Sequence, residues 1–369
     1  MDAWLCNLSS LQFLDLSDNH LHGPLPPCLE NFSSDLRVIN LARNLFEGSI
    51  SGICTKGSNL LEYFNLNGNN LDGSLPLGLV NCTSLKFLDL GNNKLHDSFP
   101  YWLDTLRNLR VLVLRSNHFY GEICTSNTTL PFTKLHIFDV SDNEFTGPLP
   151  RYYMENFEAM QREIDNEKLY SFEASISLVW KRVELLVVHY NSCTFLDLSN
   201  NYFHGEIPKS LGWLRLIRFL NLSHNQLTGN IPSSLGNLTF LEALDLSSNK
   251  LVGEIPKQLP RSLTFLAVLN LSYNYLSGPI PKGQQFETFS NDSYLGNAAL
   301  CGLPLTLQCQ GKGGGEAPNV KDSQNSRVGF GWQSVVVGYF SCAPFGIALG
   351  YLMFKHGKPR WLVRLILGD

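Results

Sequence analysis

Residues 217–232 read IRFLNLSHNQLTGNIP, and three further stretches repeat this wording with a few changes. They are LQFLDLSDNHLHGPLP at 11–26, LKFLDLGNNKLHDSFP at 85–100 and LAVLNLSYNYLSGPIP at 266–281. Each follows the pattern L-x-x-L-x-L-x-x-N, in which an asparagine ends a short run of alternating leucines. The recurrence of one pattern along the chain indicates a repeat protein rather than several separate globular domains.

The asparagine of this pattern recurs at a nearly constant step, apart from one much longer step between Asn143 and Asn201. The period and the pattern are those of leucine-rich repeats. The long step leaves room for about 33 residues beyond one ordinary repeat. Ten repeats are predicted in this way, with their asparagines at Asn19, Asn44, Asn69, Asn93, Asn117, Asn143, Asn201, Asn225, Asn249 and Asn274.

The leucines of each repeat predict its local structure. Two of them, such as Leu220 and Leu222, stand two positions apart and therefore point to the same face of a short strand. One repeat cannot enclose a core, but stacked repeats bury these leucines against one another as a parallel sheet. A glycine turn and a proline widen the opposite side, so the stack bends and its strands line a concave surface. The predicted fold is an α/β solenoid with a curved parallel sheet.

The composition excludes several classes of function. Lys and Arg number 28 against 32 Asp and Glu, a formal net charge of −4, whereas binding to nucleic acid needs a surplus of cations. Hydrophobic residues form 44% of the chain, too many for a disordered protein. The histidines are scattered and the cysteines lack zinc-site spacing. We therefore expect no enzyme activity, no cofactor and no nucleic-acid partner.

Aspartate or asparagine recurs at one solvent-facing strand position of the repeats. Stacked carboxylates could form the acid pair of a glycoside hydrolase. Because these residues recur with the repeat rather than at one site, we interpret them as part of the repeat consensus. The column, with a valine as its exception, is Asp15, Asn40, Asn65, Asp89, Val113, Asp139, Asp197, Asn221, Asp245 and Asn270.

The L-x-G-x-[IL]-P ending of the repeats resembles that of plant extracellular leucine-rich repeats. The chain as a whole is similar to the plant receptor-like proteins, which are cell-surface leucine-rich-repeat proteins without a kinase. NGNNLDGSLPLGLVNCTSLKFLDLGNNKLHDSFPYWLDTLRNLRVLVLRSNHFYG (67–121), for example, resembles their late repeats. The resemblance implies about six repeats over 1–150, an island insertion over 151–192, four further repeats over 193–285 and a C-terminal cap over 286–310.

The island has two predicted parts. Tyr153, Phe157 and Met160 recur at helical spacing within 151–168, and apolar residues then alternate, as in a strand, over 176–187. One interpretation is a plain surface excursion. The other is a loop that shapes a partner-binding site on a rigid scaffold. The sequence SLVWKRVELLV differs from the Thr-rich segment that islands of the family usually carry.

Residues 328–354 carry no charged side chain and are long enough to cross a membrane as one helix. This length disfavours the alternative of a buried soluble helix. The basic tail 355–369 predicts a cytosolic C-terminus, extracellular repeats and a flexible stalk over 311–327, as in a single-pass plasma-membrane protein. Gly346 and Gly350 form a G-x-x-x-G motif. It reflects either ordinary helix composition or helix pairing, and the resemblance implies pairing with a kinase-bearing adaptor.

Disulfides are expected in an extracellular chain. Cys301 and Cys309 would close a small loop within the segment that resembles the family's cap, so we predict a disulfide between them. The cysteines within the repeats are interpreted as small buried hydrophobic residues, and the sequence leaves their pairing open. These are Cys6, Cys28, Cys54, Cys82, Cys124 and Cys193.

Eight N-x-S/T sequons fit a chain that faces the secretory lumen. Asn221 and Asn270 are set aside, because a glycan on either would block part of the concave face. Glycosylation is predicted at Asn7, Asn31, Asn81, Asn127, Asn237 and Asn291.

Arginine and tyrosine, which often anchor protein contacts, occupy other solvent-facing positions of the predicted sheet. The alternative interpretation is ordinary surface solvation. The expected ligand is an extracellular peptide, protein or glycan, and the resemblance implies adaptor and co-receptor kinases as partners beside membrane lipid. The candidate ligand face comprises Arg37, Arg43, Arg110, Arg115, Arg218 and Tyr273.

The chain begins inside a repeat, at MDAWLCNLSSL (1–11), with neither a signal peptide nor the cysteine-paired N-terminal cap of the family. We expect a truncated member, a partial gene model or a degenerate copy. The resemblance implies a receptor that binds an extracellular ligand and signals through a partner kinase, in plant defence more often than in development. The alternatives are a developmental receptor, an extracellular inhibitor or scaffold, and a nonfunctional receptor fragment.

Overall fold

The structure is a computed structural model, and its described residues fall into two compact units. One unit comprises Met1–Glu173 and Cys193–Cys309, and the other comprises Ala174–Ser192 and Gln310–Asp369. The structure describes residues 11–26, 29, 35–50, 52–54, 60–125, 128–163, 193–283 and 285–309, and the backbone of two strands at 176–180 and 183–187.

Several predicted features lie outside these residues. The stalk, the membrane-spanning segment with Gly346 and Gly350, and the tail all fall within 311–369. Over the part of the chain that the structure does describe, every helix is too short or too polar to cross a membrane. Three of the sequons are likewise outside, namely Asn7, Asn31 and Asn127.

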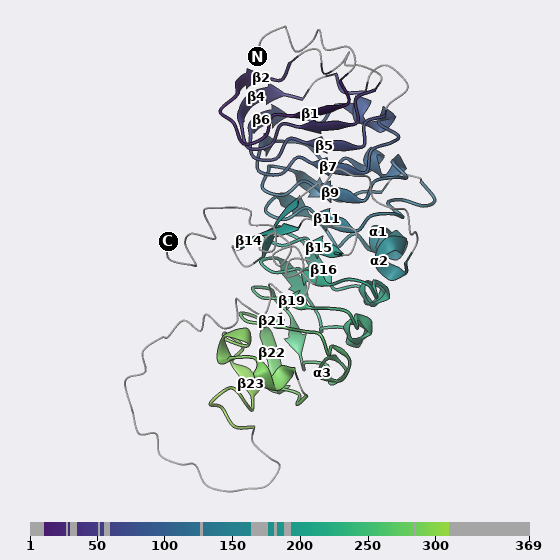
Figure 1. The fold of residues 1–369 in the computed structure, drawn as a ribbon. Helices are drawn as coiled ribbons and strands as arrows, with labels where there is room; N and C mark the ends of the chain where they lie inside the picture. The colour runs from purple at the N-terminus through teal and green to yellow at the C-terminus, as the bar shows by residue number, and fades with distance from the viewer. Residues whose placement is uncertain are drawn as a thin grey trace, which may run out of the picture. The chain divides into compact units, whose positions relative to one another are not determined.

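Ten parallel strands, one from each predicted repeat, form a single sheet within the described residues, stacked in chain order (Figure 1). Each strand is three residues long and pairs residue for residue with the next, as Phe219–Asn221 pairs with Ala243–Asp245. The predicted parallel-sheet solenoid is therefore confirmed. The strands are β1 (Phe13–Asp15), β3 (Val38–Asn40), β5 (Tyr63–Asn65), β7 (Phe87–Asp89), β9 (Val111–Val113), β11 (Ile137–Asp139), β15 (Phe195–Asp197), β17 (Phe219–Asn221), β19 (Ala243–Asp245) and β21 (Val268–Asn270).

A second set of short parallel strands runs along another side of the same unit, just after the repeat asparagines. These strands place the turn glycines of the L-x-G-x-[IL]-P ending at positive φ, as at Gly229 (φ 74°). They are β2 (His22–Pro24), β4 (Leu45–Ser49), β6 (Asn70–Gly73), β8 (Lys94–Leu95), β10 (Tyr120–Glu122), β12 (Glu144–Thr146), β16 (His204–Glu206), β18 (Gln226–Thr228), β20 (Val252–Gly253), β22 (Tyr275–Pro279) and β23 (Ala299–Cys301).

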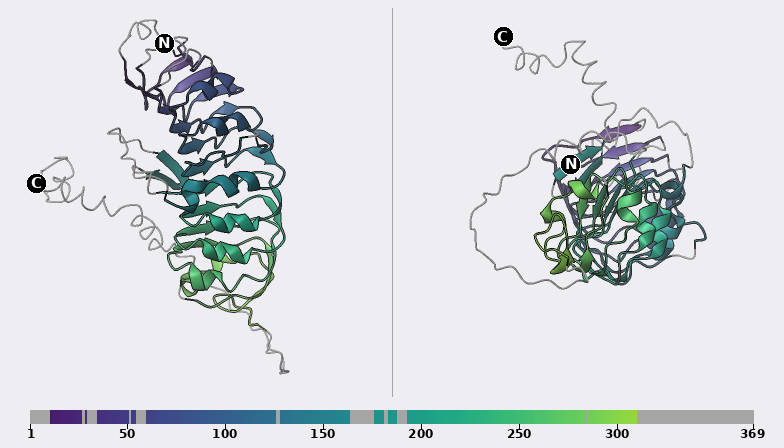
Figure 2. Two further views of the ribbon diagram at one scale, coloured as in Figure 1. Left: turned by 90° about the vertical axis from the view of Figure 1, so that its right-hand side faces the viewer. Right: turned by 90° about the horizontal axis from the view of Figure 1, so that it is seen from below.

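Short helices stack along a third side of the unit (Figures 1 and 2). Most of them begin directly after the proline that ends the repeat motif, since proline suits the first turn of a helix and needs no donor. They are η3 (Leu77–Asn81), η4 (Tyr101–Thr105), α1 (Arg151–Asn156), α2 (Glu158–Gln161), η6 (Lys209–Trp213), η7 (Ser233–Asn237) and α3 (Leu259–Ser262).

From Asn44 onward, the repeat asparagines form a buried ladder between the two sets of strands. The Asn225 side chain donates hydrogen bonds to the backbone oxygens of Leu198 (2.9 Å), Leu222 (3.2 Å) and Ser223 (3.1 Å). Its Oδ1 accepts a bond from the Phe203 backbone N–H at 3.0 Å. Each amide thus satisfies carbonyls of its own and the preceding repeat, which is why an asparagine is needed there.

The chain from 151 to 161 belongs with the sixth repeat. The helical spacing in this stretch is confirmed, although α1 and α2 are two short helices that meet at Phe157. Tyr153 and Met160 are fully buried in the core, and the Leu216 backbone N–H donates to the Met160 oxygen at 2.8 Å. The insertion that we predicted to start at residue 151 therefore begins after α2 in the structure.

The later part of the predicted island contributes a hairpin to the second unit. The alternation over 176–187, which predicted a strand, corresponds to two antiparallel strands, β13 (Ile176–Trp180) and β14 (Val183–Val187). The sheet of the first unit is not interrupted, because β11 pairs directly with β15. The long step between Asn143 and Asn201 thus lengthens the chain between two neighbouring strands without changing their register.

The last repeat is followed by a compact segment over 286–309. It contains η8 (Phe286–Thr288), η9 (Asn291–Ser293) and β23, which pairs with β22. Phe286, Phe289, Tyr294 and Leu300 are buried in the same hydrophobic cluster as the repeat leucines. The segment therefore continues the core beyond β21, as a solenoid end requires.

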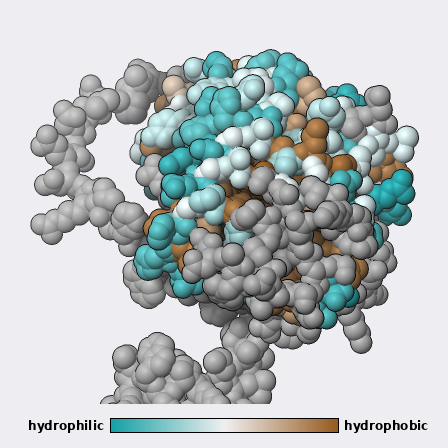
Figure 3. All heavy atoms as spheres, turned by 90° about the horizontal axis from the view of Figure 1, so that it is seen from above, coloured by the Kyte–Doolittle hydropathy of each residue, from teal (hydrophilic) through white to brown (hydrophobic). Residues whose placement is uncertain are grey.

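The opposite end of the sheet is less covered. Phe13 of β1 is 51% exposed, whereas all three residues of β7, β9 and β11 are buried. Leu11, Leu16 and Leu21 are only partly buried against the core. Seen from this end, apolar residues reach the surface among polar ones (Figure 3).

Candidate ligand-binding face

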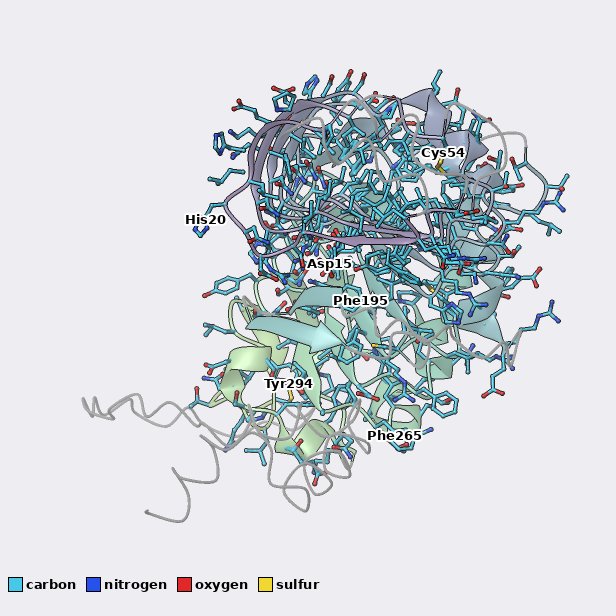
Figure 4. The ribbon with its side chains drawn as sticks, turned by 45° about the horizontal axis from the view of Figure 1, so that its top comes forward. Asp15, His20, Cys54, Phe195, Phe265 and Tyr294 are labelled. Atoms are coloured by element: carbon cyan, nitrogen blue, oxygen red, sulfur yellow. A yellow bond between two sulfur atoms is a disulfide. The ribbon has the colours of Figure 1, made fainter. Side chains whose placement is uncertain are left out.

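The face of the ten-stranded sheet that lies opposite the core, called the sheet face below, carries the predicted ligand-binding residues. It is formed by the first and third residue of each strand and by the residues that flank them, because alternate residues of a strand point to opposite faces. Leu14 of β1 packs in the core, while its neighbours Phe13 and Asp15 are exposed. Asp15 on β1 and Phe195 on β15 are labelled in Figure 4.

The aspartate and asparagine column of this face has a structural role. Each side-chain oxygen accepts a hydrogen bond from the backbone N–H two residues later, as Asp245 does from Ser247 at 3.0 Å. Asparagines also donate to the aspartate of the preceding repeat, as Asn270 does to Asp245 at 3.0 Å. In nine of the ten strands, the side-chain oxygen of the column residue accepts the hydrogen bond from the backbone N–H two residues later. The interpretation as repeat-consensus residues is therefore confirmed, and Val113, which has no acceptor, is the exception.

Three carboxyls of this column lie in an environment that favours their protonated form. Burial raises the pKa of Asp89 and of Asp139 above the usual range. Burial, together with the Asp139 charge on the neighbouring strand, raises the pKa of the Asp197 carboxyl to about 8. One oxygen of each carboxyl accepts a hydrogen bond from the turn that follows its strand.

Three of the predicted ligand-face arginines are engaged in ion pairs between neighbouring repeats. Arg37 contacts Glu62 at 2.9 Å, and Arg218 is paired with Glu242. Arg43 contacts Asp18, and its hydrogen bond holds the pKa of that carboxyl below the usual range. Ladders of this kind tie adjacent repeats together, so these side chains are less available to a ligand than the sequence suggested.

The other three predicted residues differ from these. Arg110 and Arg115, before and after β9, are buried at the middle of the sheet. Tyr273 is 57% exposed near the last strand and occupies a left-handed backbone position, with φ of 54°. The structure thus distributes the six predicted residues along the sheet rather than bringing them together in one cluster.

A disulfide joins Cys301 to Cys309 in the segment after the last repeat. A second disulfide joins Cys54 to Cys82, which are both buried, as predicted, and whose pairing the sequence left open. Their sequence separation is 28, close to one repeat, so they fall on neighbouring turns of the solenoid. Cys124 is exposed, so the prediction that it is buried is wrong.

The described sequons fall into two groups. Asn81, Asn237 and Asn291 are exposed at or within short helices. Asn221 is 8% exposed, and its amide nitrogen donates to Asp197 at 3.0 Å, so a glycan there would break a buried bond. Asn270 is partly buried and donates to Asp245 in the same way. Asn81, Asn237 and Asn291 remain predicted glycosylation sites.

Comparison with known proteins identifies the repeats. Among curated relatives, Receptor-like protein 50 of Arabidopsis thaliana is 44% identical over 354 residues, 92% of this chain and 39% of that protein. Receptor-like protein 54 of the same plant is 37% identical over 374 residues, 96% of this chain and 46% of that protein. The chain thus spans less than half the length of either relative. The Leucine Rich Repeat family matches residues 10–32, 60–82, 84–106, 192–214, 216–238, 240–262 and 265–284.

A solved structure shares the architecture. The leucine-rich-repeat ectodomain of the plant membrane receptor kinase GASSHO1/SCHENGEN3 from Arabidopsis thaliana, in complex with CASPARIAN STRIP INTEGRITY FACTOR 2, matches with a TM-score of 0.61 at 30% identity. The match covers 83% of this chain and 35% of that ectodomain. The repeat pattern, the parallel-strand solenoid and the similarity along most of the sequence agree, and the chain belongs to the leucine-rich-repeat receptor-like proteins of plants.

Proposed function

We propose that this chain binds an extracellular ligand on the sheet face and passes the signal to a partner receptor kinase in plant defence. The chain is a binding protein and not an enzyme, as is usual for its family. The observation that carries the proposal is a ten-stranded sheet whose second face is not needed for the core. Such a face presents side chains from many repeats to one elongated partner. An ectodomain of the same fold is known in complex with CASPARIAN STRIP INTEGRITY FACTOR 2, which supports a peptide or protein ligand.

Anchoring in the plasma membrane is a further part of the proposal. The uncharged stretch 328–354 has the length of a membrane-spanning helix, and the basic residues of 355–369 favour a cytosolic tail. The repeats would then lie outside the cell, joined to the helix by the stalk 311–327. The exposed sequons and the two disulfides suit that compartment.

Signalling requires a partner, because the tail 355–369 is too short to form a kinase. Gly346 and Gly350 would let a second helix approach closely within the membrane, as small residues at this spacing do. An adaptor kinase would pair there. A co-receptor kinase would contact the insertion after α2 and the last four repeats.

The test uses the full chain, tagged and produced in leaf tissue. The leaves receive apoplastic fluid from infected or from healthy plants, and the readouts are co-precipitation of receptor kinases and the burst of reactive oxygen. Defence signalling predicts a response to the infected fluid alone, whereas a developmental ligand would act in both fluids. A chain that co-precipitates no kinase under either condition would contradict the receptor function.

A matched pair of variants tests the helix contact. Gly346→Leu together with Gly350→Leu places bulk on the proposed pairing surface, and co-precipitation of the adaptor kinase should fall severalfold. Gly338→Leu adds one such leucine at another glycine of the same apolar stretch and should leave co-precipitation unchanged. Equal loss in both would mean that the motif has no special role.

A further inference from the structure

The fifth repeat departs from the others at two neighbouring positions of the sheet face. Elsewhere an aspartate or asparagine accepts a bond from the N–H two residues later, and a serine often stands there, as in Asp245 and Ser247. In the fifth repeat these positions hold Val113 and Arg115. The repeat gives up a local hydrogen bond and gains a long cationic side chain, which repeat structure alone does not require.

The preceding repeat makes room for this arginine. Gly91 occupies the position equivalent to Arg115 one repeat earlier, where Asn67 stands in the repeat before. A Cβ atom at Gly91 would lie 3.1 Å from Cγ of Arg115 and 2.8 Å from the amide nitrogen of Asn67. Gly91 does not adopt a positive φ, so space rather than backbone conformation accounts for the glycine. The stem of Arg115 therefore packs over Gly91.

The guanidinium of Arg115 differs from the ion-paired arginines of the same face. Arg37, Arg43 and Arg218 each contact a carboxylate of a neighbouring repeat. Arg115 is 3% exposed, and within the described part of the chain its Nε and Nη1 have no hydrogen-bond partner. A buried guanidinium with unmade hydrogen bonds is costly, so a group that supplies acceptors is expected at this place.

We propose that Arg115, whose stem packs over Gly91, forms a subsite on the sheet face for an anionic oxygen group of the ligand, a carboxylate or a sulfate ester. The planar guanidinium suits such groups because it offers two parallel N–H donors to two oxygens. This inference rests on the proposed ligand-binding function of the sheet face. It adds the chemical class of the group that the centre of the face recognises.

Neutralisation of nearby carboxyls is the competing explanation of Arg115. The charge of Arg115 acts on both Asp89 and Asp139, but neither carboxyl provides the missing acceptors. Asp89 accepts bonds from Asn67 and from the Gly91 backbone N–H, and Asp139 accepts bonds from Ser141. Burial also favours the protonated, neutral form of both acids, and a neutral carboxyl attracts the Arg115 guanidinium less strongly. A ligand oxygen explains the unmade bonds more fully.

The test measures anion binding to the purified full chain without any kinase or natural ligand. Sodium acetate and sodium sulfate are titrated separately against sodium chloride at constant ionic strength, and the unfolding midpoint is followed by fluorescence. A ligand that binds only the folded state raises the midpoint with its concentration. Sulfate also stabilises proteins without binding, so the result is the difference between the wild type and Arg115→Gln.

The wild type should respond to at least one of the two anions with saturation, and the apparent Kd should rise about tenfold or more in Arg115→Gln. Arg115→Lys should keep part of the response, because it retains the charge but not the planar fork. Gly91→Asn, which crowds the stem, should weaken binding with the charge intact. Arg107→Gln is the control: it removes an exposed arginine after η4, outside the sheet face, and should behave like the wild type. A response to acetate alone indicates a carboxylate, and a response to sulfate alone indicates a sulfate ester.

Two results would overturn the subsite. One is an equal response of the wild type and Arg115→Gln, which means non-specific anion effects only. The other is an equal loss in Arg107→Gln, which means a general charge effect. If Arg115→Gln fails to fold, the comparison of Arg115→Lys and Gly91→Asn with the wild type decides in the same way. Loss of kinase association in leaves would refute the proposed function and leave this titration unaffected.

Discussion

The hydroxyl of Tyr153 on α1 donates a hydrogen bond to a carboxylate oxygen of Asp104 on η4 at 3.1 Å, although the two lie far apart in the sequence. Both side chains are fully buried, and Thr128 donates to the second oxygen of Asp104 at 3.0 Å. Burial and the Asp104 charge raise the pKa of Tyr153, so the hydroxyl keeps its proton. This contact holds the start of the sixth repeat's helix against the fourth repeat.

Tyr153→Phe should therefore destabilise the protein. It removes the donor and leaves one buried oxygen of Asp104 without this bond, at a cost of about 1–3 kcal/mol. Urea denaturation of the full chain, followed by tryptophan fluorescence and circular dichroism, would measure the change. An unchanged midpoint would show that water replaces the hydroxyl and that the bond contributes little.

Tyr294→Phe should not destabilise the protein in this way. Tyr294 is fully buried in the segment after the last repeat, and within the described residues its hydroxyl has no hydrogen-bond partner. Removal of an unsatisfied buried hydroxyl should leave stability unchanged or raise it by up to about 1 kcal/mol. The same denaturation experiment tests both tyrosines, and a loss as large as that of Tyr153→Phe would mean that Tyr294 has a partner after all.

Removal of the Cys54–Cys82 disulfide should cost more than removal of the Cys301–Cys309 disulfide. The sequence separation is 28 for the first and 8 for the second, and the entropy lost by the unfolded chain grows with the span. The expected costs are about 3.5 and about 2.5 kcal/mol for the paired Cys→Ala variants. Thermal unfolding under oxidising conditions measures both. The reverse order would mean that folded-state packing, rather than loop length, governs the contribution of these bonds.

Stability should rise as the pH falls from 8 towards 5. A carboxyl whose pKa is raised in the folded state, such as Asp197 at about 8, binds a proton that the unfolded chain lacks between that value and about 4. Within this window each such proton contributes of the order of 1 kcal/mol per pH unit, and the contribution is lost as the pH rises through 8.

Asp197→Asn should flatten this dependence, because the amide does not titrate. Unfolding midpoints at pH 5, 6, 7 and 8 would show the change in slope. Tyr294→Phe serves as the control, since the Tyr294 hydroxyl keeps its proton throughout this range. An unaltered slope in Asp197→Asn would mean that another ionisable group causes the pH dependence of stability.

The sequence predicted most of the sheet because its signals are local and periodic. Leu220 and Leu222 define a strand by spacing alone, and Asn225 recurs because each repeat must satisfy the same carbonyls. One further step of this ladder was missed. Asn297 follows Asn274 by one repeat length, donates to the Leu271 oxygen at 3.0 Å and accepts from the Leu276 N–H, but the leucines around it have been replaced.

The availability of the ligand-face arginines was not predictable from one repeat at a time. Arg37 and Glu62 belong to neighbouring repeats, so their pairing appears only when adjacent repeats are set side by side. The same holds for Cys54 and Cys82. The boundary at residue 151 was misplaced for a different reason. Helical spacing in 151–161 was read as foreign to the repeat, although a short helix after the proline is what the other repeats also contain.

Direct pairing of β11 with β15 has an evolutionary consequence. The ladder crosses the join unbroken, since Asn201 donates to the Val140 oxygen at 3.0 Å and accepts from the Phe145 N–H. Lengthening a closed span somewhat more than twofold, as this join does, costs only about 0.8 kcal/mol of chain entropy. Insertions at this join can therefore vary in length and sequence between related proteins without disrupting the parallel sheet.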